Sequence, residues 1–234
     1  MPLSPTAQRA LDAYGGEARW RAASEIHLVL SAGGLAFRLK WQPPLVRARQ
    51  VLAVHEPRVR CAGIDRAGDT GVLEGQDVRL EAPDGRPLEA RRDARSFFGP
   101  GRRWLFWDRL DQTYFACYAA WNYFTLPALL LRADVRWTEM GPGLLEARFP
   151  PHLPTHSPVQ RFRFDPETGF LLQHDYTAEI IGGWAHAARV VLEHGSQGDV
   201  PYPSRMRMTP RAGDGSPRPL PLLVAVEAHA FELR

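Results

Sequence analysis

The fold is decided by residues 170–194, whose sequence is FLLQHDYTAEIIGGWAHAARVVLEH. The runs Phe170–Ile181 and Trp184–His194 contain aromatic and aliphatic residues that favour strands, and Gly182-Gly183 separates them. A glycine pair between two such runs is typical of a two-residue hairpin turn, because glycine adopts the positive φ angles that this turn requires. The segment therefore predicts a pair of antiparallel strands.

The same pattern recurs along the rest of the chain. Ile26–Ser31 and Leu35–Trp41 flank Gly33-Gly34, which predicts a second hairpin. Other short runs of strand composition end at proline, glycine or aspartate. They are Val46–His55, Arg58–Ala62, Gly71–Leu80 (as two short strands), Pro87–Asp93, Val135–Trp137, Leu144–Phe149, Gln160–Phe164, Arg205–Thr209 and Leu222–Leu233. Prolines predict a loop at 150–158 and a break at 201–203.

Two segments have the residue spacing of helices. Ser4-Pro5 offers a capping hydroxyl followed by proline at the first helical position, and Gly15-Gly16 ends this short helix. Asp108–Leu131 repeats apolar residues at helical spacing, and Pro127 is expected to end or kink that helix. The order of helix, strands, helix and strands, in which hairpins dominate, predicts one α+β domain over residues 1–234 with a mostly antiparallel sheet.

The composition limits the class of protein. Of the 234 residues, 44% are hydrophobic and 24% are charged, and the net charge is only +3, which excludes a disordered chain. Lys40 is the only lysine among 29 basic residues, and 26 acidic residues are interspersed with them, so no nucleic acid is expected as a partner. The arginines on predicted strands are expected to face solvent, with Arg189 as the main exception. The segment from Met1 to Gly16 lacks the apolar core of a signal peptide, which predicts a cytoplasmic location.

One uncharged segment raises the question of membrane contact. Thr113–Leu131 has 19 residues without a charge, which is long enough to span a bilayer. Asn122, Pro127 and aromatic residues spread along the segment argue against a span, because aromatic residues of membrane helices gather at the ends. We therefore expect a buried helix or one that makes peripheral contact with a membrane.

Short motifs near both ends of the chain resemble those of the LolA/LolB/LppX lipoprotein-carrier superfamily. At the start, Tyr14-Gly15-Gly16 and Trp20 precede the first predicted strand, like the helix in that group that ends in a glycine pair. The later motifs, which are similar to the closing hairpins of the group, are Phe164-Asp165, Gly169-Phe170-Leu171, His174-Asp175-Tyr176, Gly198 and Tyr202-Pro203. The resemblance implies a curved sheet that forms an incomplete β-barrel around one long helix and holds an apolar cavity. The violacein-pathway enzyme of the same fold, which has no signal peptide and needs no cofactor, is a second point of comparison.

The aromatic helix is the element best suited to line such a cavity. Its tyrosine, tryptophan and asparagine side chains combine apolar surface with a few polar groups, which suits an apolar or aromatic small molecule such as a lipid-like ligand. The alternative is that these side chains only form the hydrophobic core against the sheet. The candidate ligand-binding residues are Trp107, Tyr114, Tyr118, Trp121, Asn122 and His174. Arg102-Arg103, just before the helix, can meet an anionic group, although such a pair is commonly a solvated turn.

The hairpin of residues 170–194 also carries polar side chains suited to acid–base chemistry. With a two-residue turn at Gly182-Gly183, Glu179 faces His186 on one side of the sheet, and Tyr176 faces Arg189 on the other side. A glutamate beside a histidine is a candidate general base, and a tyrosine beside an arginine can bind an oxyanion or a carboxylate. These four are the candidate catalytic residues of a cofactor-independent enzyme of secondary metabolism that transfers protons on a hydrophobic substrate. The alternative is that they are ordinary cross-strand polar pairs.

Neither a metal nor a cofactor is expected. His152 and His156 lie in the proline-rich loop, and His174 and His186 are expected on opposite faces of the hairpin, so they form no ligand set. The two cysteines have neither disulfide-framework nor zinc-type spacing and are expected to be buried. The sequence contains no Walker loop, dinucleotide fingerprint or Gly-x-Ser-x-Gly motif.

Overall fold

A computed structural model describes residues 3–65, 67–99, 101 and 104–234. The strands are β1 (Glu25–Gly33), β2 (Leu45–Ala53), β3 (Arg58–Ala62), β4 (Thr70–Glu74), β5 (Asp77–Glu81), β6 (Pro87–Arg91), β7 (Arg136–Gly141), β8 (Leu144–Arg148), β9 (Val159–Phe164), β10 (Leu171–Thr177), β11 (His186–Gln197), β12 (Val200–Pro210) and β13 (Val224–Leu233). The helices are α1 (Pro5–Ala13), α2 (Glu17–Ala22), α3 (Leu35–Leu39), α4 (Arg109–Phe124), α5 (Leu126–Leu130) and the 3₁₀ helix η1 (Ala94–Phe97).

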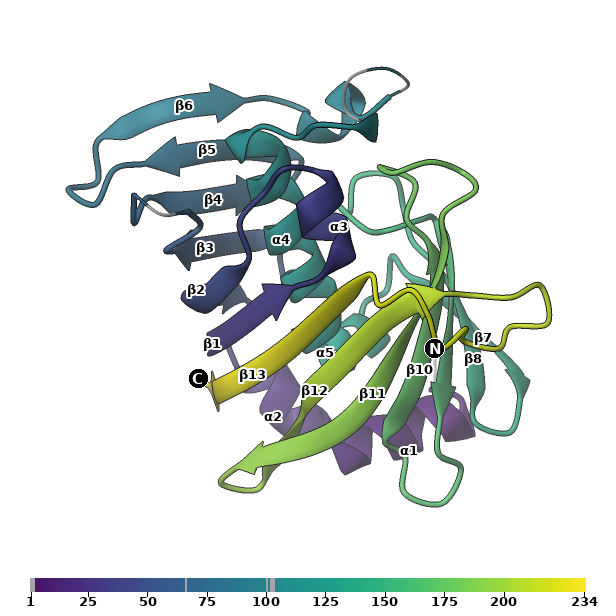
Figure 1. Ribbon diagram of the computed structural model, residues 1–234. Coiled ribbons are helices and arrows are strands. Elements are labelled where there is room, and N and C mark those ends of the chain that lie inside the picture. The colour runs from purple at the N-terminus through teal and green to yellow at the C-terminus, as the bar shows by residue number, and fades with distance from the viewer. Residues whose placement is uncertain (1–2, 66, 100, 102–103) are drawn as a thin grey trace.

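All of these strands belong to one antiparallel sheet, in the order β6-β5-β4-β3-β2-β1-β13-β12-β11-β10-β9-β8-β7. The sheet curves around α4, and its edge strands β6 and β7 do not pair with each other (Figure 1). The prediction of an α+β fold is confirmed, as are the incomplete barrel around one long helix and the short N-terminal helix.

Strand β1 lies in the middle of the sheet, between β2 and β13. Ile26 lies opposite Leu233 and Gly33 lies opposite Ala225, so the first and last strands run side by side over their whole length. Buried residues alternate along β1, as expected for a strand with one face on the core. The hydrophobic core therefore lies on the concave side of the sheet, around the helices.

Helix α4 begins where two aspartates cap it. The carboxylate of Asp108 accepts a hydrogen bond from the backbone N–H of Asp111 at 2.9 Å, and the backbone N–H of Asp108 donates to the Asp111 carboxylate at 3.1 Å. Arg91 of β6 lies 2.7 Å from a carboxylate oxygen of each aspartate. This ion-pair network fixes the start of the helix against the edge of the sheet.

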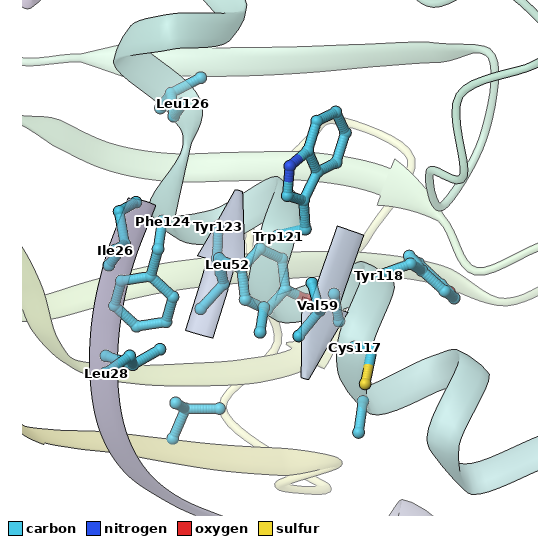
Figure 2. Packing of buried hydrophobic residues seen from close by; sticks show 14 of the residues in the cluster. Ile26, Leu28, Leu52, Val59, Cys117, Tyr118, Trp121, Tyr123, Phe124 and Leu126 are labelled. Carbon is cyan, nitrogen blue, oxygen red and sulfur yellow. The ribbon is translucent and has the colours of Figure 1, made fainter. Parts of the chain in front are cut away.

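The uncharged segment that follows is core. Every residue from Thr113 to Leu130 is buried except Phe115, which is partly buried. Figure 2 shows Phe124 of this segment in one cluster with Ile26 and Leu28 of β1. Pro127 lies in the first turn of α5, so the predicted end of the long helix near this proline is confirmed. Among the described helices, none is long and apolar enough to cross a membrane.

The segment Leu35–Trp41 is not the strand that its alternating pattern predicts, because helix α3 forms there. Gly34 has φ 140°, and a Cβ atom at this position would lie 2.6 Å from the carbonyl oxygen of Leu223. Glycine thus lets the chain turn from β1 directly into the helix, in which only Phe37 is buried. The strand that pairs with β1 is β2, which begins after this helix.

Two further predictions about strand boundaries are wrong. Strand β12 continues through 201–203, where a break was expected, because this end of β12 pairs only with β11 and its other edge needs no backbone donors. The turn between β10 and β11 has eight residues, 178–185, in place of the two at Gly182-Gly183. Thr177 therefore pairs with His186, and His174 pairs with Arg189.

Candidate ligand-binding site

An apolar pocket lies between α4 and the concave face of the sheet. Its cavity volume is small, about 50 Å³, and it is partly open to solvent. Strands β1, β12 and β13 contribute Leu30, Met208, Val224 and Val226, and α4 contributes Phe115, Ala116, Ala119, Ala120, Tyr123 and Phe124. The alanines leave room beside the helix, because a methyl group fills little of the space between two packed elements. Gln50, Tyr123 and Tyr176 are the lining residues that carry polar groups.

Arg189 is buried beside this pocket. Its side chain is fully inaccessible to solvent, and no described group accepts a hydrogen bond from its Nε, Nη1 or Nη2 atoms. The centre of its guanidinium lies 4.1 Å from the centre of the Tyr123 ring, which is a cation–π contact. A cation enclosed among neutral groups is costly, so this contact offsets only part of its desolvation.

The sheet places Arg189 next to the pocket. Arg189 pairs with His174 of β10 on one side and with Met208 of β12 on the other, and Met208 pairs in turn with Val224 of β13. Neighbouring strands are about 4.8 Å apart, so paired residues form a row across the sheet. Met208 and Val224 line the pocket. The row therefore leads from the buried arginine into the apolar space.

A network of tyrosine hydroxyls and one imidazole lies beside the arginine. The hydroxyls of Tyr123 and Tyr176 are 2.9 Å apart. The imidazole of His156 lies with Nε2 2.9 Å from the Tyr123 hydroxyl and Nδ1 3.1 Å from the Tyr118 hydroxyl. Its ring stacks on the Tyr176 ring with centroids 3.8 Å apart. The cluster is polar but closed, because its members satisfy one another.

His174 is held in one tautomer. The amide nitrogen of Gln160 donates to the carbonyl oxygen of Ser157 at 2.8 Å, so its oxygen is the atom that faces His174 Nε2 at 2.6 Å. Nε2 therefore carries the proton, and Nδ1 has no hydrogen-bond donor among the described groups. The ring stacks on Phe162 with centroids 4.1 Å apart.

The groups around Arg189 are uncharged at neutral pH. Burial and the nearby Arg189 charge lower the pKa of His156 and of His174 well below the usual value, so both imidazoles stay neutral. Burial raises the pKa of Tyr176 to about 12 and that of Tyr123 well above its usual value, so neither is a phenolate. Arg189 keeps its proton although burial lowers its pKa. The cluster therefore carries a single positive charge.

The candidate catalytic residues do not come together in one site. Tyr176 and Arg189 are buried, as part of the cluster beside the pocket. Glu179 lies in the turn after β10, where its carboxylate is 2.7 Å from Arg95, and His186 is exposed with Nδ1 3.0 Å from the Thr177 hydroxyl. The predicted Glu179–His186 pair does not form, because the longer turn shifts the register. A catalytic role for these residues stays a prediction.

The candidate ligand-binding residues lie mostly on other faces of α4. The indole N–H of Trp121 donates to the carbonyl oxygen of Ala53, and the side-chain amide of Asn122 donates to the carbonyl oxygen of Pro154. None of the candidates lines the apolar pocket. In the described structure they belong to the hydrophobic core or to the polar cluster. Trp107 packs on Phe98 and Phe115, Tyr114 donates to Gln76, Tyr118 contacts His156, and His174 lies beside Arg189. Their ligand-binding roles stay predictions, and Arg102-Arg103 falls outside the described residues.

Sequence reasoning missed the residues that shape the site. Ala116, Ala119 and Ala120 lie at helical spacing, and this stripe of small residues is a signal that could have identified the pocket face. His156 was expected only as part of the proline-rich loop, and its burial depends on the loop packing onto α4. No cluster of metal-ligating side chains occurs among the described residues.

Comparisons with known proteins support the architecture. Neither a protein-family model nor a curated protein matches the sequence. A LolA superfamily protein from Nitrosomonas europaea is similar in structure over 100% of this chain and 94% of its own, with TM-score 0.54 and 8% identity. An outer membrane lipoprotein-sorting domain from Vibrio parahaemolyticus covers 98% of this chain and 91% of its own, with TM-score 0.50 and 11% identity.

A third solved structure extends the same likeness. A DUF1329 family protein from Desulfovibrio piger covers 99% of this chain and 93% of its own, with TM-score 0.50 and 11% identity. At these identities the likeness concerns the fold, and it agrees with the resemblance carried by the short sequence motifs. The chain has the LolA-type fold, an open antiparallel barrel around a central helix.

Proposed function

We propose that the protein binds an apolar or lipid-like small molecule in the pocket between α4 and β1, β12 and β13. The observation that carries the proposal is the lining: alanines along one face of α4 leave space, and aliphatic side chains cover the opposite wall. Small-molecule sites are commonly concave and mostly apolar with a few polar residues, which here are Gln50, Tyr123 and Tyr176.

The structural neighbours are consistent with this proposal. One of them is described as an outer membrane lipoprotein-sorting domain, and a lipid-like ligand agrees with that description. The proton-transfer alternative has less support, because Glu179 is paired with Arg95 in a partly exposed turn and His186 is paired with Thr177.

Filling the pocket tests the proposal. N-phenyl-1-naphthylamine, a neutral dye that fluoresces in apolar surroundings, is titrated into the protein, and saturable binding is expected. Ala120→Leu places three more carbon atoms in the pocket and should weaken dye binding by about tenfold or more. Ala225→Leu, on the exposed face of β13, is the matched control and should bind the dye as the unchanged protein does.

The same titration can contradict the proposal. Absence of saturable binding in the unchanged protein would count against a ligand pocket. Equal dye affinity in Ala120→Leu and the unchanged protein would place the dye elsewhere on the surface, provided that thermal unfolding shows both to be folded.

A further inference from the structure

We propose that Arg189 binds the carboxylate of the ligand, so that the protein selects amphiphiles with one carboxylate and an apolar body. This inference rests on the proposed function, because it names the chemical class of molecule that the pocket takes. It is argued from the burial of the guanidinium, from the charges around it and from its contacts with residues that line the pocket.

The first argument is the burial of an unmatched cation. Arg189 has no exposed surface, and its three guanidinium nitrogens have no acceptor among the described groups. Other arginines on strands lie beside acidic side chains: Arg60 is paired with Glu81, and Arg205 with Glu193. A buried charge normally has a partner of opposite sign, so an anion is the group that this position requires.

The second argument is the charge count. The side chains that interact electrostatically with the guanidinium come from α1, α4, the 150–158 loop, β10 and β11, and they are Tyr14, Tyr123, His156, His174, Tyr176 and His194. All are neutral at neutral pH, and none carries a carboxylate. One positive charge among neutral donors matches an anion of one negative charge. A phosphate dianion would leave a buried charge uncompensated.

The third argument is geometry. The guanidinium is planar and presents parallel N–H groups that match the two oxygens of a carboxylate. Tyr123 contacts Arg189 through its ring and also lines the pocket, as does Tyr176. Met208, the strand neighbour of Arg189, lines the pocket as well. Arg189 does not itself line the pocket, so a carboxylate at the tyrosine end of the pocket reaches the guanidinium only past the Tyr123 ring, with the apolar body of the molecule along the alanine face of α4.

A matched set of ligands tests the inference. Decanoate, decanol and decyl phosphate share one alkyl chain and differ in the head group, and each displaces the neutral dye in a competition titration. The unchanged protein is expected to bind decanoate at least about tenfold more tightly than decanol and decyl phosphate. Arg189→Met should lose this preference and still bind decanol. The control Arg161→Met, at an exposed position on β9, should keep the preference.

A second measurement does not depend on the alkyl chain. Sodium acetate should raise the midpoint of thermal unfolding relative to sodium chloride at equal ionic strength in the unchanged protein, and it should not do so in Arg189→Met.

The outcomes separate the two proposals. If dye and decanol bind but decanoate shows no advantage, or if Arg189→Met keeps the advantage, the carboxylate site is overturned and the apolar pocket stands. Preference for decyl phosphate overturns the carboxylate as the head group. If no alkyl ligand binds while acetate still stabilises only the protein that has Arg189, the anion site stands and the apolar pocket fails. Absence of both effects overturns both.

Discussion

The centre of the Arg189 guanidinium lies 4.1 Å from the centroid of the Tyr123 ring, inside the protein core. The two residues come from β11 and α4, so the contact joins the curved sheet to the central helix. The Tyr123 hydroxyl also forms hydrogen bonds with the Tyr176 hydroxyl and with the imidazole of His156. Sheet, helix and loop therefore meet at one tyrosine, and the contacts of this tyrosine govern several of the predictions below.

Replacing the buried arginine is expected to leave the ligand-free protein as stable as before or more stable. Arg189→Met removes an unpaired buried charge, which outweighs the loss of a cation–π contact worth up to about 2 kcal/mol. Urea denaturation measures the free energy of unfolding, and Arg205→Met serves as the exposed control. A loss of more than about 2 kcal/mol in Arg189→Met would show that Arg189 has a stabilising partner in the folded state.

Removing one hydroxyl from the polar cluster should be costly. Tyr123→Phe leaves the Tyr176 hydroxyl and His156 Nε2 without their shared partner, and the free energy of unfolding is expected to fall by about 1–3 kcal/mol. Tyr202→Phe is the control, because that ring is stacked on Phe231 and keeps this contact without its hydroxyl. Equal stability of the two variants would contradict the network, as measured by urea denaturation.

Stability should fall as the solution is acidified below neutral pH. His156 and His174 have folded-state pKa values well below the usual value, and burial followed by the Arg189 charge lowers that of His194 to about 4. The unfolded chain binds these protons near pH 6.5, so it takes up more protons than the folded protein below that pH. The stability contributed by the neutral imidazoles is complete above about pH 6.5 and is lost toward the folded-state pKa.

The two fully buried imidazoles make the largest contributions to this effect. Each should lower the free energy of unfolding by about 2 kcal/mol between pH 7 and pH 5. Urea denaturation at several pH values above the carboxylate range measures the slope. His174→Gln should flatten the slope, and His186→Gln, at an exposed position, is the control. An unchanged slope in His174→Gln would mean that His174 titrates alike in both states.

The cap of the central helix should depend on one arginine. Arg91→Met leaves Asp111, which is fully buried, without the guanidinium that lies 2.7 Å from it. Breaking a buried pair in this way is expected to cost about 3 kcal/mol of unfolding free energy. Arg58→Met removes an exposed pair with Glu56 and should cost less than about 1 kcal/mol. Thermal and urea unfolding compare the two variants, and similar losses would contradict the role of the cap.

The sequence was enough to predict most strands, the capped N-terminal helix and the kinked central helix. These features depend on local patterns: Ser4-Pro5 at one helix start, Pro127 at the break of the other, and alternation along most of the strands. The prediction of an open barrel came from the resemblance of short motifs to those of the lipoprotein-carrier superfamily. Leu35–Trp41 was misread because its apolar residues alternate like those of a strand, whereas the contact of Gly34 with Leu223 that redirects the chain is long-range.

The candidate site was predicted in part for a simple geometric reason. The pairing of β10 with β11 differs from the predicted register by two residues, because the turn is longer than expected. Side chains alternate with a period of two, so a shift of two keeps each residue on its face. Tyr176 and Arg189 thus remain on the predicted common face, although their partners change. The place of His156 was not accessible from local patterns, because a loop distant in sequence carries it to the cluster.

The pairing of β1 with β13 has a consequence for the order in which the molecule is made. As the ribosome delivers the chain, β1 emerges early and has β2 as its neighbour, but its other edge waits until β13 emerges at the far end of the sequence. Leu30 on β1 and Val226 on β13 face the same pocket, so its wall contains a seam between early and late segments. During synthesis the pocket therefore closes last, and a nascent chain without β13 leaves a hydrophobic strand edge that a chaperone or another chain can bind.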